Sequence, residues 1–146
     1  MVNKRQQKIN EFCGLGNLER YRNELEGIFD LIEAHGCKIS ARTDEHSSQH
    51  VYDSIGGCHI RISLQEQYKA PVDILWTILH EFGHHLSGKS STSKHTKEQK
   101  LKREVLAWYY AEKLLGEFPR LSDMKPAFIA YKDECLDSYN KGFTGD

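Results

Sequence analysis

One short segment of the chain has the residue types and the spacing of a metal site. Its sequence is HEFGH, and its two histidines, His80 and His84, stand four positions apart. On an α-helix, residues at this spacing lie one turn from each other on the same face, so both imidazoles can reach one metal ion. Imidazole nitrogen is a common zinc ligand, and the carboxylate of Glu81 can accept a proton from the water that zinc activates. The segment therefore predicts that His80 and His84 bind zinc and that Glu81 is a catalytic general base.

A catalytic zinc site usually has three protein ligands and a water molecule, so the two histidines need a third partner. The side chain of His85 points about 100° away from that of its neighbour in the motif, which makes it a poor ligand for the same ion. The carboxylates of Glu104 and Glu112 lie on or beside the apolar stripe of the helix predicted after the motif, where an unpaired charge is costly. Periodicity slightly favours Glu112, and the residues alone leave both candidates open, together with His95 in the intervening loop.

The apolar residues before the motif predict a helix followed by a small sheet. From Leu18 they recur every three or four positions, as on one face of an amphipathic helix that Gly36 ends. In Cys58–Leu64 apolar and polar residues alternate, which predicts a strand with one buried face. Shorter strands are predicted at 37–41 and 51–54, and the three strands together would form a small antiparallel sheet.

Helical periodicity returns at the motif and continues almost to the end of the chain. Ile74 begins the apolar run that carries the motif, and Gly88 ends it. After a polar loop at 89–97, helices are predicted over 98–117 and, more weakly, over 122–140. The inner face of the first should consist of Leu101, Val105, Trp108 and Leu115, and that of the second of Phe128, Tyr131, Cys135 and Tyr139. The sequence thus predicts an α+β fold that is mostly helical, with a roughly three-stranded sheet packed beside the motif helix.

Length and charge indicate one domain that binds neither a membrane nor nucleic acid in general. The 146 residues suit a single domain, 1–146, of which 1–14 are expected to be frayed or only partly helical. Twenty Lys and Arg against 21 Asp and Glu leave a net charge of −1, whereas a general nucleic-acid surface needs an excess of positive charge. There is no apolar run of the roughly 18–20 residues that span a bilayer and no secretion signal, so we expect a cytoplasmic protein.

The cysteines lead to the same expectation. The chain has four, at positions 13, 37, 58 and 135, without a C-x-x-C pair. Because cytosolic thiols are kept reduced, disulfides are rare in that compartment. The sequence therefore predicts buried free thiols.

The residues after the motif resemble those of a known class of peptidases. Glu104 follows His84 by 20 residues, which is the separation in thermolysin-like gluzincins. The segment 104–115, EVLAWYYAEKLL, is similar to the E-x-x-A-x-x-F-A-x-x-L-L stretch of the ImmA/IrrE-like metallopeptidases, with Tyr110 in place of Phe. Members of that family often have a second acidic residue two positions after the first, as in E-x-E-A, whereas this chain has Leu106 at that position.

The resemblance implies a small zincin-type domain with gluzincin chemistry. In such a domain, Glu104 would join His80 and His84 as the third ligand of one zinc ion per chain, and Glu81 would activate the attacking water. Members of this family are compact cytosolic proteins of bacteria and of their mobile elements, and they are implicated in cleaving regulators. The expected substrate is therefore a protein or peptide, with a regulatory protein as the leading case.

Several questions stay open at the level of sequence. No spacing selects the donor that would stabilise the oxyanion of a peptidase; the candidates are Tyr109, Tyr110, His59 and His85. The strand Cys58–Leu64 is a candidate edge for pairing with an extended substrate. The alternative function is a zinc-stabilised regulatory or protein-binding module without significant proteolysis. The basic residues in Lys94–Arg103 are expected to form a solvated helix face rather than a nucleic-acid site.

Overall fold

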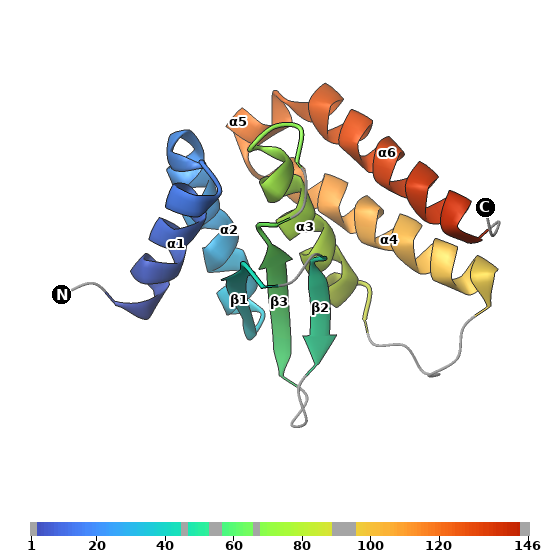
Figure 1. Ribbon diagram of the computed structural model, residues 1–146, viewed down its shortest axis with the longest axis horizontal. Coiled ribbons are helices and arrows are strands. Elements are labelled where there is room, and N and C mark those ends of the chain that lie inside the picture. Colours follow the sequence, from blue (N-terminus) through green and yellow to red (C-terminus); the bar gives the residue numbers. More distant parts are fainter. Residues whose placement is uncertain (1–2, 45–46, 53–56, 66–67, 89–95, 144–146) are drawn as a thin grey trace.

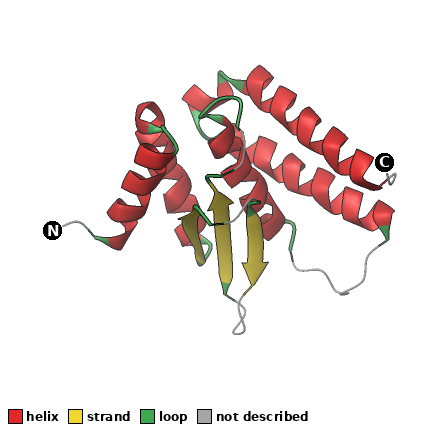
Figure 2. Ribbon diagram, viewed as in Figure 1, coloured by secondary structure: helices red, strands yellow, loops and turns green. Residues whose placement is uncertain are grey.

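Helices and one small sheet account for most of the described chain (Figures 1 and 2). The structure is a computed structural model that describes residues 3–44, 47–52, 57–65, 68–88 and 96–143. Its elements in chain order are α1 (Lys4–Leu15), the 3₁₀ turn η1 (Glu19–Tyr21), α2 (Arg22–Ala34), β1 (Cys37–Arg42), β2 (Gln49–Tyr52), β3 (Cys58–Ser63), α3 (Asp73–Leu86), α4 (Lys97–Leu115), α5 (Pro119–Ser122) and α6 (Lys125–Phe143). The predicted α+β class, mostly helical with three strands, is confirmed.

The sheet has the order β1-β3-β2, and its pairing differs from the predicted one. β2 runs antiparallel to β3, whereas β1 runs parallel to it. Successive strands do alternate in direction along the chain, but an all-antiparallel sheet would also require that consecutive strands pair. Here β3 lies between the other two, so β1 pairs with the strand that shares its direction. Residues 53 and 54 of the predicted second strand lie outside the described residues.

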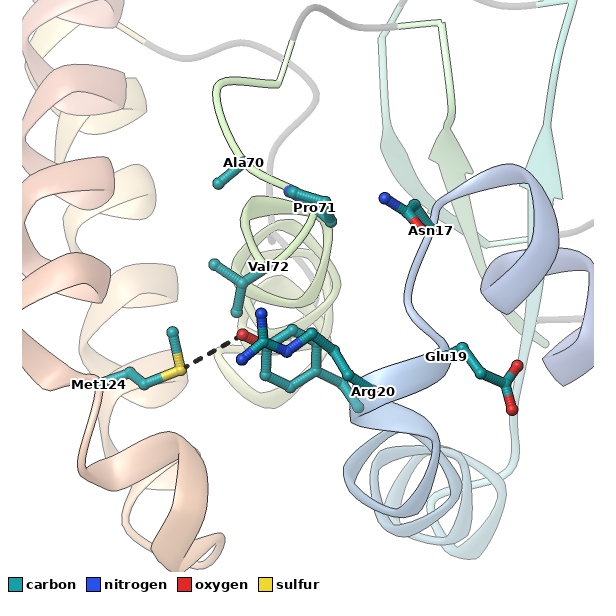
Figure 3. Close-up of a pocket in the computed structure, with 8 residues that line it drawn as sticks. Asn17, Glu19, Arg20, Ala70, Pro71, Val72 and Met124 are labelled. Atoms are coloured by element: carbon teal, nitrogen blue, oxygen red, sulfur yellow. Dashed lines mark hydrogen bonds between the residues drawn. The ribbon is translucent and has the colours of Figure 1, made fainter.

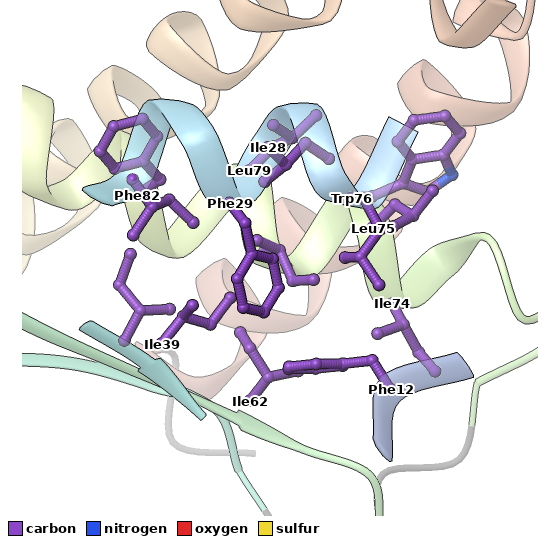
Figure 4. Close-up of a cluster of buried hydrophobic side chains, with 14 of the residues drawn as sticks. Phe12, Ile28, Phe29, Ile39, Ile62, Ile74, Leu75, Trp76, Leu79 and Phe82 are labelled. Atoms are coloured by element: carbon purple, nitrogen blue, oxygen red, sulfur yellow. The ribbon is translucent and has the colours of Figure 1, made fainter. Parts of the chain in front are cut away.

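One face of the sheet packs against the helices and forms one side of the hydrophobic core (Figure 1). The register places Cys37 opposite Cys58, Ile39 opposite Ile60 and Ala41 opposite Ile62, and since neighbours in register share a face, their side chains all point the same way. Figure 4 shows Ile39 and Ile62 directed toward the buried aromatic and aliphatic side chains of α1, α2 and α3. The helices therefore pack on the face of the sheet that carries these side chains.

The start of the chain is more ordered than the sequence predicts. Residues 4–15 form α1, whose first turn is capped by the Asn3 side chain, and Ile9 and Phe12 are buried in the core. Arg5 tethers the helix to α2 through an ion pair of 2.5 Å with Asp30. The expectation of fraying at 1–14 is therefore wrong for the described residues, because buried side chains and the contacts of Arg5 and Asn10 with α2 stabilise a mostly polar helix.

Helix α3 lies at the centre of the fold. It packs on β2 and β3 on one side and on α4 and α6 on the other (Figure 1). The helix predicted over 122–140 corresponds to α6, which begins at Lys125 and ends at Phe143, and the short helix α5 precedes it. Among the described helices, none combines the length and apolar character needed to cross a membrane.

Candidate metal centre

Helix α3 carries the HEFGH motif and is fixed in place by the core. Its buried apolar side chains are Ile74, Leu75, Trp76, Ile78, Leu79 and Phe82. These side chains anchor the helix in the core, with Trp76 packed edge-on against Phe128 of α6, and the face with His80 and His84 is turned toward α4. The centres of the two imidazole rings lie 4.7 Å apart, so the i, i+4 spacing brings them together as predicted.

The motif and one residue of α4 form a compact group of metal-ligating atoms. A ring nitrogen of His80, one of His84 and a carboxylate oxygen of Glu81 lie within 4.8 Å of one another. Glu104 Oε2 lies 2.6 Å from His84 Nε2 and 3.4 Å from His80 Nε2. Zinc bonds of about 2.0–2.2 Å in a tetrahedral site separate the ligand atoms by about 3.3–3.6 Å. The distance of Glu104 Oε2 from His80 Nε2 lies in this range, and its distance from His84 Nε2 is shorter. The three predicted ligands are therefore brought to one point.

The two carboxylates considered as third ligand lie in different surroundings on α4. Glu104 faces α3, whereas the carboxylate oxygens of Glu112 lie 3.8 Å from Lys125 Nζ and 3.5 Å from Lys132 Nζ, both in α6. His95 lies outside the described residues. The structure thus brings Glu104, and not Glu112, to the two histidines.

The periodicity that slightly favours Glu112 does not identify the face of α4 that packs. Val105, expected on the inner face of α4, is 49% exposed. The residues of α4 that are buried are Ala107, Trp108, Ala111 and Leu115. Glu104 continues this face by one turn toward the start of the helix. Because alanine is weakly hydrophobic, a count of large apolar residues overlooks the face that makes contact.

Small residues allow α3 and α4 to approach closely at the motif. A Cβ atom added to Gly83 would lie 2.1 Å from the carbonyl oxygen of Ala107, far inside van der Waals contact. Gly83 stands directly before His84, and Ala107 stands one turn after Glu104. This backbone contact therefore sets the distance across which the ligands of the two helices meet.

Burial and charge define the electrostatics of the group. Burial alone would lower the pKa of His80, but the nearby carboxylates of Glu104 and Glu81 raise it to about 9. Burial alone would raise the pKa of Glu104, but His80 and His84 lower it to about 2. The His80 ring is further held by stacking on Trp108, with ring centres 4.3 Å apart. A buried anion beside two oriented imidazoles is an environment that favours a cation.

Buried ligand atoms that make no hydrogen bond also fit a bound metal ion. His80 Nε2 and Glu104 Oε2 are both buried, and although Glu104 Oε2 lies at ion-pair distance from both imidazoles, neither atom has a partner of hydrogen-bond geometry among the described residues. Buried polar atoms without partners are costly in free energy, and a shared cation would satisfy both at once. Two imidazole nitrogens and one carboxylate oxygen are a ligand set typical of catalytic zinc.

A cavity of about 170 Å³ opens onto this group and is closed on one side by α6. Its lining includes His80, Glu81 and Glu104 and, from α6, Tyr131 and Tyr139. An adjoining hollow of about 830 Å³ shares Glu104 and Tyr139 with it. The aromatic stripe of α6 is visible in the sequence, but nothing in its spacing shows that it faces the metal-ligating residues.

The hydroxyl groups of the two tyrosines in this cavity, Tyr131 and Tyr139, have different surroundings. The Thr77 hydroxyl donates to the carbonyl of Asp73 at 2.9 Å and lies 2.9 Å from the Tyr131 hydroxyl. Since Thr77 has only one hydroxyl proton, the proton in the second bond comes from Tyr131. Burial and the negative charge of Glu104 raise the pKa of Tyr139, which keeps that phenol protonated. Tyr139 therefore places a protonated phenol on the wall of this cavity.

The four oxyanion donors considered from the sequence do not line this cavity. Tyr109 is 51% exposed and its ring packs beside Lys113, and Tyr110 contacts Tyr109. His59 bonds to Ser40 at 3.0 Å on the sheet face away from the core, and His85 stacks on Phe82.

The substrate edge considered from the sequence is also wrong. β3 is the central strand and pairs with a strand on each side, so it cannot accept a further strand. The strand next to the cavity is β2, an outer strand, and Ser48 directly before it lines the cavity.

A further cavity, of about 610 Å³, lies between η1, the start of α3 and Met124 (Figure 3). The Tyr21 hydroxyl donates to the sulfur of Met124 across it at 3.8 Å. None of the site residues predicted from the sequence lines this cavity.

Two of the four cysteines are bonded to each other, which corrects the prediction of free thiols. Cys37 and Cys58 face each other in register on β1 and β3 and form a disulfide. Cys13 and Cys135 remain thiols. Sequence spacing could not show this pairing, because it depends on which strands are neighbours.

Comparison with known proteins finds no match to this chain: no protein-family model, no curated protein and no solved structure is significantly similar to it. The arrangement of the four side chains therefore carries the functional argument.

Proposed function

We propose that this protein is a zinc-dependent metallopeptidase that hydrolyses peptide bonds of a protein substrate. The observation that carries the proposal is the meeting of His80, His84 and Glu104 at one point, with Glu81 beside them. In this role His80, His84 and Glu104 bind the metal, and Glu81 is the general base. We place the reaction in the cytoplasm and expect a regulatory protein as substrate.

When bound, zinc would polarise the scissile carbonyl and lower the pKa of the attacking water. The chain itself supplies proton transfer and orientation. Glu81 accepts a proton from the water and returns it to the leaving amine, and its carboxylate oxygen is positioned 3.2 Å from Nδ1 of His80. Trp108 holds the His80 ring in one orientation by stacking. Tyr139 donates a hydrogen bond to the developing oxyanion from the opposite wall of the cavity.

The metal content of purified protein tests the first part of this proposal. With the Cys37–Cys58 disulfide intact, we expect about one zinc ion per wild-type chain and none in Glu104→Ala, because two imidazoles alone make an incomplete site. Elemental mass spectrometry after dialysis measures the stoichiometry.

Glu112→Ala is the matched control on the same helix. It loses only surface ion pairs with Lys125 and Lys132 and should retain the metal. Equal zinc content in Glu104→Ala and wild type would remove Glu104 from the site, and a wild type that takes up no zinc would remove the site itself.

Tyr139→Phe tests the role proposed for α6. We expect kcat for hydrolysis of a quenched-fluorescence peptide to fall about 100-fold or more, as when one oxyanion donor is removed, with the zinc content unchanged. Tyr131→Phe is the matched control, since its hydroxyl proton is already donated to Thr77, and it should lose much less activity. An equal loss in the two variants would contradict a specific role for Tyr139.

A further inference from the structure

A second group of metal-ligating side chains lies on the sheet side of α3. It consists of Cys37, Cys58 and His85, whose two sulfur atoms and one imidazole nitrogen lie within 4.8 Å of one another. The cysteines come from neighbouring positions of β1 and β3, and His85 comes from α3, one residue after the motif. Three segments that are far apart in the sequence therefore meet at this point.

The surroundings of the group suit a bound metal. Cys37 and Cys58 are buried in the core, whereas His85 is partly exposed, so an ion held by all three would have protein on its sulfur side and solvent within reach on its imidazole side. The ring of His85 is held by parallel stacking on Phe82, with ring centres 5.9 Å apart. The Tyr52 hydroxyl lies 3.5 Å from Nδ1 of His85, close enough to help orient the ring.

The chemistry of the group depends on the state of its sulfur atoms. Thiolate sulfur and imidazole nitrogen are the usual ligands of structural zinc, with bonds of about 2.3 Å and about 2.0–2.1 Å. In the disulfide, the sulfur atoms are bonded to each other and neither is a thiolate. Reduction would release two thiols at a place where an imidazole is already within reach.

We propose that Cys37, Cys58 and His85 form a second zinc site, which exists in the dithiol form of the protein and is lost in the disulfide form. Two electrons from a dithiol reductant break the bond between the two sulfur atoms, and the reductant becomes a disulfide. Cys37 and Cys58 each gain a proton in this step, and both protons are released when the thiolates bind Zn²⁺. Oxidation by a disulfide compound reverses the step and expels the ion. The fourth position of the zinc is taken by water.

Zinc stoichiometry in the two redox forms is the first test. The full chain is reduced with a phosphine, which is removed under oxygen-free conditions before zinc is added. We expect about two zinc ions per chain in the reduced form and about one in the disulfide form. The reduced double variant Cys37→Ser/Cys58→Ser should bind one.

Cobalt substitution shows which ligands the second ion has. Co²⁺ bound to thiolate gives a charge-transfer absorption in the near ultraviolet, which a site of two imidazoles and a carboxylate does not give. The reduced wild type should show this absorption, and so should Glu104→Ala, in which the proposed catalytic site is removed. The thiolate absorption therefore reports metal binding at the second site even if the proposed catalytic site binds no metal.

Two further variants identify the thiolates and the imidazole that bind the second ion. Cys135 lines the cavity at His80 and is the thiol nearest the proposed catalytic site, so Cys135→Ser must keep the absorption. His85→Ala keeps both cysteines and should weaken binding of the second ion at least tenfold. This variant still tests the second site if the double serine variant does not fold. A reduced wild type that binds one ion without the thiolate absorption, or an absorption lost in Cys135→Ser, would overturn the proposal.

Discussion

Replacement of Glu81 by Gln is expected to slow peptide hydrolysis about 100- to 10,000-fold and to leave the bound zinc in place. Glutamine has nearly the same shape as glutamate, so the packing of this buried residue, 7% exposed, is preserved. Its amide cannot accept a proton from the attacking water. The proposed ligands His80, His84 and Glu104 are unchanged, so metal binding should remain near the wild-type level.

The measurement combines kcat on a quenched-fluorescence peptide with zinc content on the same samples. Glu112→Gln is the control for the loss of one carboxylate, because Glu112 pairs with lysines of α6 away from the motif. Turnover at the wild-type rate in Glu81→Gln would exclude Glu81 as the base. A wild type that binds zinc, holds a protein partner and cleaves nothing would favour the alternative function, a zinc-stabilised binding module.

The part of the site that lies within one helix was predictable from the sequence. His80 and His84 are brought together by the helical repeat alone, and this spacing is fixed by local geometry. The position of Glu104 could not be predicted from local geometry, because it depends on how α4 packs against α3. Resemblance to gluzincins favoured it, whereas the periodicity of large apolar residues slightly favoured Glu112.

The features that sequence reasoning missed depend on contacts between distant segments. The disulfide of Cys37 and Cys58 requires that β1 be the neighbour of β3, and the hydrophobic pattern of a strand does not identify its neighbours. Tyr139 is recognisable as part of an aromatic stripe, but its place at the cavity depends on the packing of α6. Helix α1 was missed because its stability comes from the burial of Ile9, Phe12 and Cys13 against the rest of the core, which the low apolar content of the helix does not reveal.

The contact of Gly83 with Ala107 leads to the second large expected effect. Glycine in the middle of a helix is normally worse than alanine by about 0.5–1 kcal/mol, so Gly83→Ala would stabilise an isolated α3. In the folded protein, however, the new Cβ would lie 2.1 Å from the carbonyl oxygen and 2.9 Å from the carbonyl carbon of Ala107. These are backbone atoms of α4, which cannot rotate away as a side chain would.

We therefore expect Gly83→Ala to force α3 and α4 apart, to lower the free energy of unfolding by about 3 kcal/mol and to reduce zinc binding. Zinc binding should fall because Glu104 moves away from His84 together with α4. Urea denaturation of the metal-free protein measures the loss of packing alone, and metal content measures the effect on the site. Gly14→Ala in α1 is the matched control, because among the described residues no atom beyond its chain neighbours and the backbone of its own helix lies within 4 Å of the added Cβ, and it should be neutral or stabilising. If Gly83→Ala were as stable as Gly14→Ala and kept its zinc, the close contact of α3 and α4 could not be what positions Glu104.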